Sequence, residues 1–179
     1  MDFTPEQLRY PIGKYTTPEN ITQDQISAWI DEINAFPAKL RITVSGLNDR
    51  QLNTPYREEG WTLRQVVHHL ADSHMNAYIR YKLAITEQEP VIRPYDEKKW
   101  AECEEAKTAD IDISLALIDT LHKRWVLFLR SLKYEDFERT YIHPEHNKVF
   151  SLKNVTGMYV WHGDHHLHHI LQTIERNNW

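Results

Sequence analysis

Histidines are concentrated in one short stretch near the C-terminal end of this chain, and that stretch strongly constrains the fold. The sequence has 11 histidines, and five of them lie in the run WHGDHHLHH at residues 161–169. His162 and His166 are four residues apart, so on an α-helix their side chains project from one face about one turn apart. Two neutral imidazoles at this separation can bind one divalent ion, so the run predicts a helix that carries a metal site.

The residues around this run indicate which way the histidines point. At about 100° per residue, His162 and His166 share a helical face that is mostly apolar, made by Val155, Met158, Tyr159, Ile170 and Thr173. His169 lies at the edge of this face, His165 lies further round, and His168 points away from it. We therefore expect His162 and His166 to face the interior as metal ligands. The alternative is a pair of core histidines that are satisfied by hydrogen bonds.

The rest of the chain has the pattern of an all-α protein. Only five glycines are present, and long stretches repeat apolar residues with a period of 3.6. We expect four helices, at about residues 22–47, from residue 62 until the pattern fades near Pro90, and at about 112–132 and 151–177. The second begins at Thr62 with the capping-box sequence TLRQ, and Pro37 should bend or split the first. Four helices of about 20 residues predict a four-helix bundle.

Two connections add detail to this bundle. The joint between the second and third helices, residues 88–110, is long enough for a crossover to a parallel neighbour. Before the fourth helix, residues 140–144 and 148–152 are expected to pair as a small hairpin around Glu145, His146 and Asn147. A chain of this length can bury a sizeable core, so we expect residues 1–179 to form a single domain.

Composition narrows the classes of function. A net charge of −5 with no basic run argues against a nucleic-acid partner. No apolar stretch is long enough to span a membrane, and the N-terminal residues lack the pattern of a signal peptide. The single cysteine, Cys103, has no partner for an internal disulfide, and its acidic neighbours disfavour a nucleophilic thiolate. These features predict a cytoplasmic protein without a membrane partner.

A third metal ligand is needed, because catalytic zinc sites commonly use three protein ligands. The remaining candidates are His68, His69, His74, His122, His143 and His146. On the second helix, His74 lies in the middle of the apolar face and His69 lies on its flank, in a polar line that reaches Arg80. His68 lies on the opposite side and is expected to face solvent. Periodicity does not separate His69 from His74, so both stay open as ligands, with a plain core role as the alternative for His74.

Four segments resemble the DinB/YfiT superfamily. Residues 60–73, GWTLRQVVHHLADS, are similar to its second-helix motif, in which a His-Leu-x-Asp supplies the first metal ligand; the matching residue is His69. Residues 159–166, YVWHGDHH, resemble its fourth-helix HxxxH, so His162 and His166 match the other two ligands. The segments RYPIGKY and RPYDEK resemble the YfiT subgroup. The resemblance covers nearly the whole chain and implies a four-helix bundle with one divalent metal ion, such as zinc or nickel, per chain.

The same resemblance implies an enzyme that acts on a small molecule. The first expectation is an S-transferase that conjugates a low-molecular-weight thiol such as bacillithiol to an electrophile, since a metal ion would deprotonate the thiol. Such a thiol carries carboxylates, and Arg80 is the candidate to bind them, with a structural ion pair as the alternative. The second expectation is a metal-dependent hydrolase, as YfiT-like proteins are commonly described, which uses an activated water. The third is a non-enzymatic, metal-bearing interaction protein.

Other residues are candidates for a place next to the site, and none of them is identified as the catalytic acid or base. Asp72 can orient the His69 ring, or it can be a solvated charge on the helix. Tyr159 can line the pocket or pack in the core, and His169 is a further neighbour. Asp164 points about 180° away from the face of the metal ligands, which disfavours a zincin-type protease. The resemblance also implies a homodimer.

Overall fold

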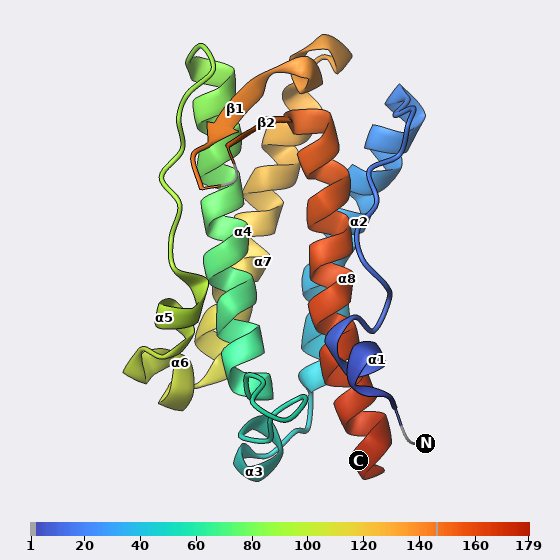
Figure 1. The fold of residues 1–179 in the computed structure, drawn as a ribbon, viewed down its shortest axis with the longest axis vertical. Coiled ribbons are helices and arrows are strands. Elements are labelled where there is room, and N and C mark those ends of the chain that lie inside the picture. The colour runs from blue at the N-terminus through green and yellow to red at the C-terminus, as the bar shows by residue number, and fades with distance from the viewer. Residues whose placement is uncertain (1–2, 146) are drawn as a thin grey trace.

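The computed structural model describes residues 3–145 and 147–179, and it confirms the four-helix bundle with a small hairpin before the last helix (Figure 1). The bundle consists of α2 (Gln23–Val44), α4 (Leu63–Thr86), α7 (Ile111–Ser131) and α8 (Leu152–Asn177). The shorter elements are α1 (Pro5–Arg9), α3 (Asp49–Leu52), α5 (Glu97–Ala101), α6 (Glu104–Thr108), the 3-10 helix η1 (Tyr134–Glu138), β1 (Thr140–His143) and β2 (Lys148–Ser151). His146, a candidate ligand, lies outside the described residues.

The long connection between α4 and α7 makes these two helices parallel neighbours, as predicted. Contacts between them advance toward the C-terminal ends of both helices. His68 of α4 lies 2.7 Å from Ser114 of α7, and further along both helices His74 lies 2.7 Å from His122. Residues 87–110 therefore return along the outside of the bundle and carry α5 and α6 with them (Figure 1). This return path lies beside α4, so the crossover passes the outer side of the bundle about halfway along its length.

The helices begin where their capping residues stand. The Thr62 hydroxyl accepts a hydrogen bond from the Gln65 backbone N–H, and the Gln65 side chain accepts one from the Thr62 N–H, which confirms the capping box. The Thr22 hydroxyl caps α2 by accepting a hydrogen bond from the Gln25 backbone N–H, and the Asp110 carboxylate caps α7. These caps satisfy backbone N–H groups that have no partner inside their helices.

Pro37 does not split the first long helix, so that part of the expectation was wrong, and the expected bend stays a prediction. α2 continues from Gln23 to Val44 with Pro37 buried inside it. A proline in a helix interior costs about 3 kcal/mol, partly because the carbonyl four residues earlier loses its donor. That carbonyl belongs to Ile33, and it accepts a hydrogen bond from another helix instead, since His122 Nδ1 lies 2.7 Å away. Burial of Phe36 and Leu40 on either side adds to the compensation.

The predicted hairpin forms and fastens the crossover. β1 pairs antiparallel with β2, with Thr140 opposite Ser151 and His143 opposite Lys148. The crossover runs beside this pair, because the Ile92 N–H donates to the Ile142 carbonyl at 3.0 Å and the Ile142 N–H donates to the Pro90 carbonyl at 2.9 Å. The hairpin thus fixes the start of the return path at one end of the bundle.

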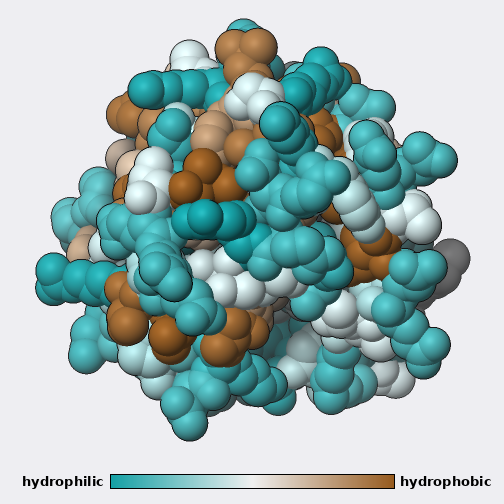
Figure 2. All heavy atoms as spheres, turned by 90° about the horizontal axis from the view of Figure 1, so that it is seen from above, coloured by the Kyte–Doolittle hydropathy of each residue, from teal (hydrophilic) through white to brown (hydrophobic). Residues whose placement is uncertain are grey.

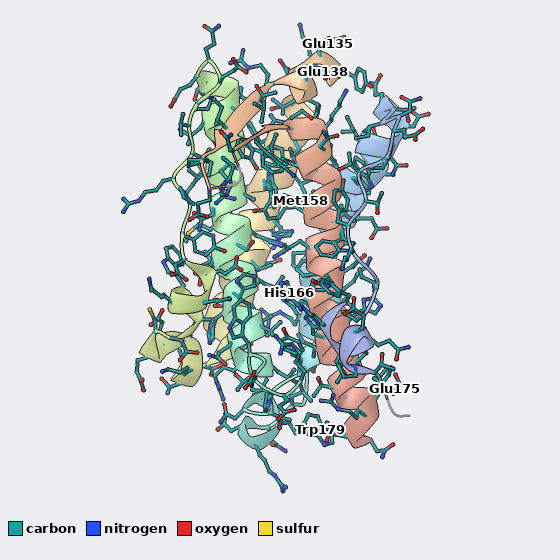
Figure 3. All side chains as sticks on the ribbon, in the orientation of Figure 1. Glu135, Glu138, Met158, His166, Glu175 and Trp179 are labelled. Atoms are coloured by element: carbon teal, nitrogen blue, oxygen red, sulfur yellow. The ribbon has the colours of Figure 1, made fainter. Side chains whose placement is uncertain are left out.

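The core consists of two apolar clusters that are separated along the bundle axis. One cluster surrounds Trp125 and Tyr81 and lies near the hairpin, and the other surrounds Leu70 and Leu63. The side chains between them are mainly histidines, contributed by α4, α7 and α8: His69, His74, His122, His162 and His166. His166 accordingly lies midway along the bundle, below Met158 (Figure 3). We call these five residues the histidine layer.

The face of the molecule at one end of the bundle is largely polar. In a view along the bundle, hydrophilic side chains cover most of the visible face and apolar ones are scattered among them (Figure 2). Across the described residues, no helix combines the length and the apolar character needed to cross a membrane.

Gly163, a poor helix former in the middle of α8, has a packing reason to be glycine. A Cβ at this position would lie 2.9 Å from a ring carbon of Phe36 on α2. We expect Gly163→Ala to lower the free energy of unfolding by about 1–3 kcal/mol, although alanine favours helix by about 1 kcal/mol. Urea unfolding of metal-free protein measures this change. The loss should shrink in a Phe36→Leu background, and a stabilised Gly163→Ala variant would contradict the close approach of these helices.

Candidate metal centre

Three histidines from two antiparallel helices meet in the middle of the bundle. His69 comes from α4, and His162 and His166 come from successive turns of α8. One ring nitrogen from each lies within 4.8 Å of the others. The Nε2 atoms of His69 and His162 are 3.4 Å apart. Nitrogens bound tetrahedrally to one zinc ion at about 2.0–2.1 Å would be about 3.4 Å apart, so this spacing fits a metal site.

The electrostatics of the cluster favour neutral rings. Burial lowers the pKa of His69 to about 4, with the charge of His165 contributing. Burial, together with the neighbouring histidines, also lowers the pKa values of His162 and His166 well below the ordinary range. Neutral imidazoles offer lone pairs and not charges, and three of them leave open positions on a divalent ion. The donor set therefore fits a divalent cation and does not distinguish zinc from nickel.

His74, which periodicity left open as a ligand beside His69, is not in this group of three. Its Nε2 atom lies 3.3 Å from His162 Nδ1, the nitrogen on the far side of that ring from His69. Its Nδ1 atom lies 2.7 Å from His122 Nε2. His74 and His122 are both buried, so the structure places them behind a candidate ligand.

His68 is buried, so the expectation that it faces solvent was wrong. Its side chain lies 2.7 Å from the Ser114 hydroxyl and 3.3 Å from the Ala109 carbonyl. The expectation assumed that α4 has only one covered face. In the structure α7 and α6 cover the side of α4 opposite α8, because the parallel crossover returns there.

The N-terminal segment covers the outer side of the α8 histidines. His165 is buried with its ring stacked on Trp161 and tilted against Tyr10. His169 lies with Nδ1 3.4 Å from His166 Nδ1 and with Nε2 3.3 Å from the Arg9 carbonyl. His169 therefore touches a candidate ligand, and its role next to the site stays a prediction.

The other candidate neighbours differ in their surroundings. Burial raises the pKa of the Asp72 carboxyl to about 6, with Glu105 contributing, but within the described residues this carboxyl forms no hydrogen bond to His69. Its role in orienting that ring stays a prediction. Tyr159 is buried, stands edge-on to the His74 ring and donates a hydrogen bond to the Ser73 carbonyl at 3.4 Å.

Two cavities open beside the three histidines. One, of 460 Å³, extends toward the hairpin and includes Arg80, Tyr95 and Tyr159 in its wall. The other, of 610 Å³, extends toward the α3–α4 loop. Both are lined by His69, Glu97, Lys98, Trp161 and His162. The candidate metal centre is therefore open to a small molecule from two sides.

Sequence reasoning missed Glu97, Lys98 and Trp61 as parts of this site. The ring of Trp61 lies 4.6 Å from that of His69, while Glu97 and Lys98 come from the crossover. A signal existed, because the crossover is longer than a simple return requires and contains aromatic residues. Periodicity cannot show where such a segment lies.

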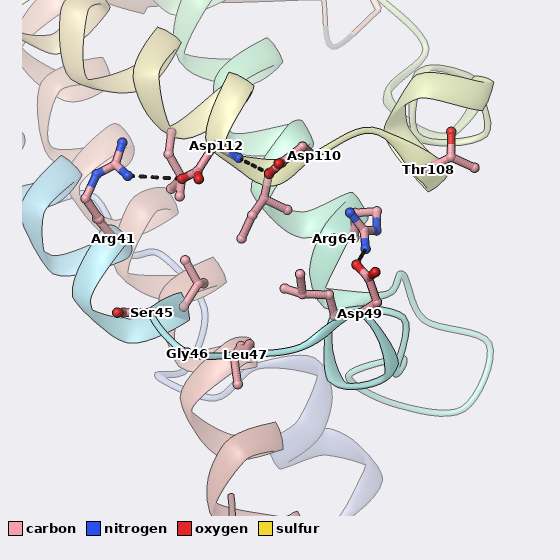
Figure 4. Close-up of a pocket in the computed structure, with 13 residues that line it drawn as sticks. Arg41, Ser45, Gly46, Leu47, Asp49, Arg64, Thr108, Asp110 and Asp112 are labelled. Atoms are coloured by element: carbon pink, nitrogen blue, oxygen red, sulfur yellow. Dashed lines mark hydrogen bonds and ion pairs between the residues drawn. The ribbon is translucent and has the colours of Figure 1, made fainter.

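A third cavity, of 610 Å³, lies at the end of the bundle where α2, α3 and α7 meet (Figure 4). Its buried cation is already neutralised, because Arg64 pairs with Asp49 at 2.6 Å. Arg41 pairs with Asp112 at 3.1 Å across the same space. These charges are used in joining the helices, so this cavity offers no comparable chemistry.

The chain matches known proteins over nearly its whole length. Residues 32–170 match the model of the DinB superfamily. Bacillus subtilis YfiT is 51% identical over 176 residues, which cover 98% of this chain and 99% of YfiT. A Bacillus pumilus protein is 51% identical over 172 residues, with 96% and 98% covered, and both relatives are named provisionally as metal-dependent hydrolases. The solved structure of Bacillus subtilis YfiT, described as a probable metal-dependent hydrolase with an unusual four-helix bundle topology, matches with a TM-score of 0.95 over 97% of this chain and 99% of that one.

Substitution of one candidate ligand should show whether metal binding depends on the group of three histidines or on any buried histidine. We expect His69→Ala to abolish stoichiometric zinc binding, because two imidazoles bind a divalent ion weakly. His68→Ala removes a buried histidine from the adjacent position, outside the group of three, and should keep the metal. Metal content after dialysis, measured by mass spectrometry, checks both variants. Equal loss of metal in the two would contradict the assignment of His69.

The buried neutral histidines should make the metal-free protein sensitive to acid. Burial lowers the pKa of His122 from its ordinary value of 6.5 to about 4 in the folded state. Between these values the unfolded chain binds a proton that the folded chain does not, so stability falls as the pH falls. Each such histidine should lower the free energy of unfolding by about 1.4 kcal/mol per pH unit. Urea unfolding at pH 7, 6 and 5 in the presence of a chelator tests this. His122→Phe should reduce the slope by about one proton, and equal stability at pH 7 and 5 would refute the prediction.

Proposed function

This chain belongs to the DinB superfamily, and from that premise we propose that it is a metal-dependent hydrolase of small molecules. The observation that carries the proposal is the group of three neutral histidines at the junction of two cavities. Three protein ligands with open positions are typical of catalytic metal sites, whereas structural sites are closed. The provisional hydrolase names of the relatives support hydrolysis more than thiol transfer.

His69, His162 and His166 would hold the cation. When bound, a zinc or nickel ion would supply Lewis-acid activation of a water molecule and of the scissile carbonyl or phosphoryl group. The protein must then accept a proton from the water. Glu97 is the carboxylate best placed for this, because it lines the 460 Å³ cavity and also the 610 Å³ cavity beside the histidines.

Arg80 supplies positive charge for the substrate. Its side chain is buried in the wall of the 460 Å³ cavity, and its Nε atom has no hydrogen-bond partner. Within the described part of the chain it forms no ion pair with a carboxylate. A buried cation without an acidic partner favours a substrate that brings an anionic or strongly polar oxygen.

Hydrolysis can be tested with chromogenic substrates. We expect zinc- or nickel-loaded protein to hydrolyse at least one of p-nitrophenyl acetate, p-nitrophenyl phosphate and an amino-acid p-nitroanilide, and the chelator-treated protein to be inactive. Glu97→Gln should retain the metal and lower kcat roughly 100-fold, because it loses a general base. Steady-state kinetics with parallel metal analysis measures this. Protein with stoichiometric metal and no turnover on any of the three would count against the proposal.

Thiol transfer, our first expectation from the sequence, stays a prediction, and the same metal-loaded and metal-free proteins can test it. Isothermal titration of metal-loaded and metal-free protein with bacillithiol separates the two reactions. Metal-dependent binding with proton release would indicate that the thiol coordinates the ion, in favour of transfer. A homodimer also stays a prediction, and sedimentation velocity would show it.

A further inference from the structure

The histidine layer and the adjoining His169 include residues that neither the three-histidine group nor a simple core explains. His74 and His122 lie behind His162, and His169 lies behind His166. Each series ends at a backbone carbonyl, Ile33 in one and Arg9 in the other. A backbone carbonyl can only accept hydrogen bonds, whereas each ring nitrogen of a neutral histidine can be donor or acceptor. It therefore fixes the direction of every bond in the series.

The first series can be followed atom by atom. Because the Ile33 carbonyl accepts, His122 must donate from Nδ1, over a distance of 2.7 Å. A neutral imidazole has one N–H, so His122 Nε2 accepts from His74 Nδ1, also at 2.7 Å. His74 Nε2 then accepts from His162 Nδ1 at 3.3 Å. The proton of His162 is thereby held on Nδ1, and the lone pair is left on Nε2, the atom 3.4 Å from His69 Nε2.

The second series is also fixed by a backbone carbonyl at its end, and it contains one histidine fewer. The Arg9 carbonyl accepts from His169 Nε2 at 3.3 Å. His169 Nδ1 then accepts from His166 Nδ1 at 3.4 Å. His166 is left with its lone pair on Nε2. Two of the three candidate ligands thus have their protons placed by bonds on the side away from the metal.

Both terminal carbonyls lack a donor within their own helices. Pro37 has no N–H, so the Ile33 carbonyl four residues earlier has no donor within α2. Arg9 is the last residue of α1, where helix carbonyls lack partners inside the helix. Each helix therefore presents an unused acceptor to a buried histidine.

We infer that His74, His122 and His169 are positioning residues, which hold His162 and His166 in the tautomer that directs the Nε2 lone pair at the metal, with the carbonyls of Ile33 and Arg9 as anchors. The inference deepens the proposed function, because it rests on a metal site at the three histidines. It does not depend on which reaction the metal supports. Partners of this kind, behind a ligand, contribute typically 10- to 100-fold to metal affinity.

The tautomers can be measured directly in metal-free wild-type protein. Long-range proton–nitrogen NMR spectra of protein labelled with ¹⁵N-histidine distinguish Nδ1–H from Nε2–H rings. We expect His162 and His166 to be Nδ1–H and His169 to be Nε2–H. A His162 ring that carries its proton mainly on Nε2 would overturn the inference. No variant and no activity assay is needed for this result.

Zinc affinity in variants tests the consequence, by competition with a chromophoric chelator. His122→Phe should weaken zinc binding roughly 10- to 100-fold. His68→Phe is the matched control, because it removes another buried histidine that contacts α7, and its affinity should be unchanged. Equal affinities in His122→Phe and the wild type, or equal losses in both variants, would overturn the inference.

Pro37→Ala provides a variant that retains every histidine. It returns an N–H to α2, which competes for the Ile33 carbonyl, so zinc binding should weaken by a smaller factor. The melting temperature of the metal-free protein should meanwhile rise, because proline disfavours a helix interior. A merely structural role for the series would move both quantities together. Normal zinc binding and tautomers without hydrolysis would reject the proposed function and leave this inference intact.

Discussion

The structure depends on the burial of five polar rings in the middle of a helical bundle. Imidazoles in such a place are costly unless their nitrogens have partners. Here the partners of the ring nitrogens are other imidazoles and backbone carbonyls. The apolar clusters on either side exclude water from the layer and keep its rings neutral. Packing and coordination chemistry are therefore parts of the same arrangement.

The topology brings these rings together. α7 lies parallel to α4 with His122 beside His74, and a parallel neighbour needs a long connection. That connection returns along the bundle and brings Glu97 and Lys98 to the edge of the cavities. The crossover thus serves two purposes, since it sets the direction of α7 and completes the wall of the site.

Much of this arrangement could be predicted from the sequence. Apolar periodicity and the capping box gave the four helices, and the phase of α8 placed His162 and His166 inward. Periodicity along a single helix could not choose between His69 and His74, because both face covered sides of α4. It was wrong about His68 for the same reason. A split at Pro37 was among the expected outcomes because local rules cannot include a donor that arrives from a helix far away in the sequence.

The sequence separation of the histidines has a consequence for how the protein acquires its metal. His69 and His162 are 93 residues apart, and they meet only where α8 docks against α4. No local hairpin of helices can bring all three histidines together, since so long a loop must close before His69 joins the other two. Coordination by all three histidines therefore requires that the final helix has docked. Tight metal binding would thus report the completion of the bundle.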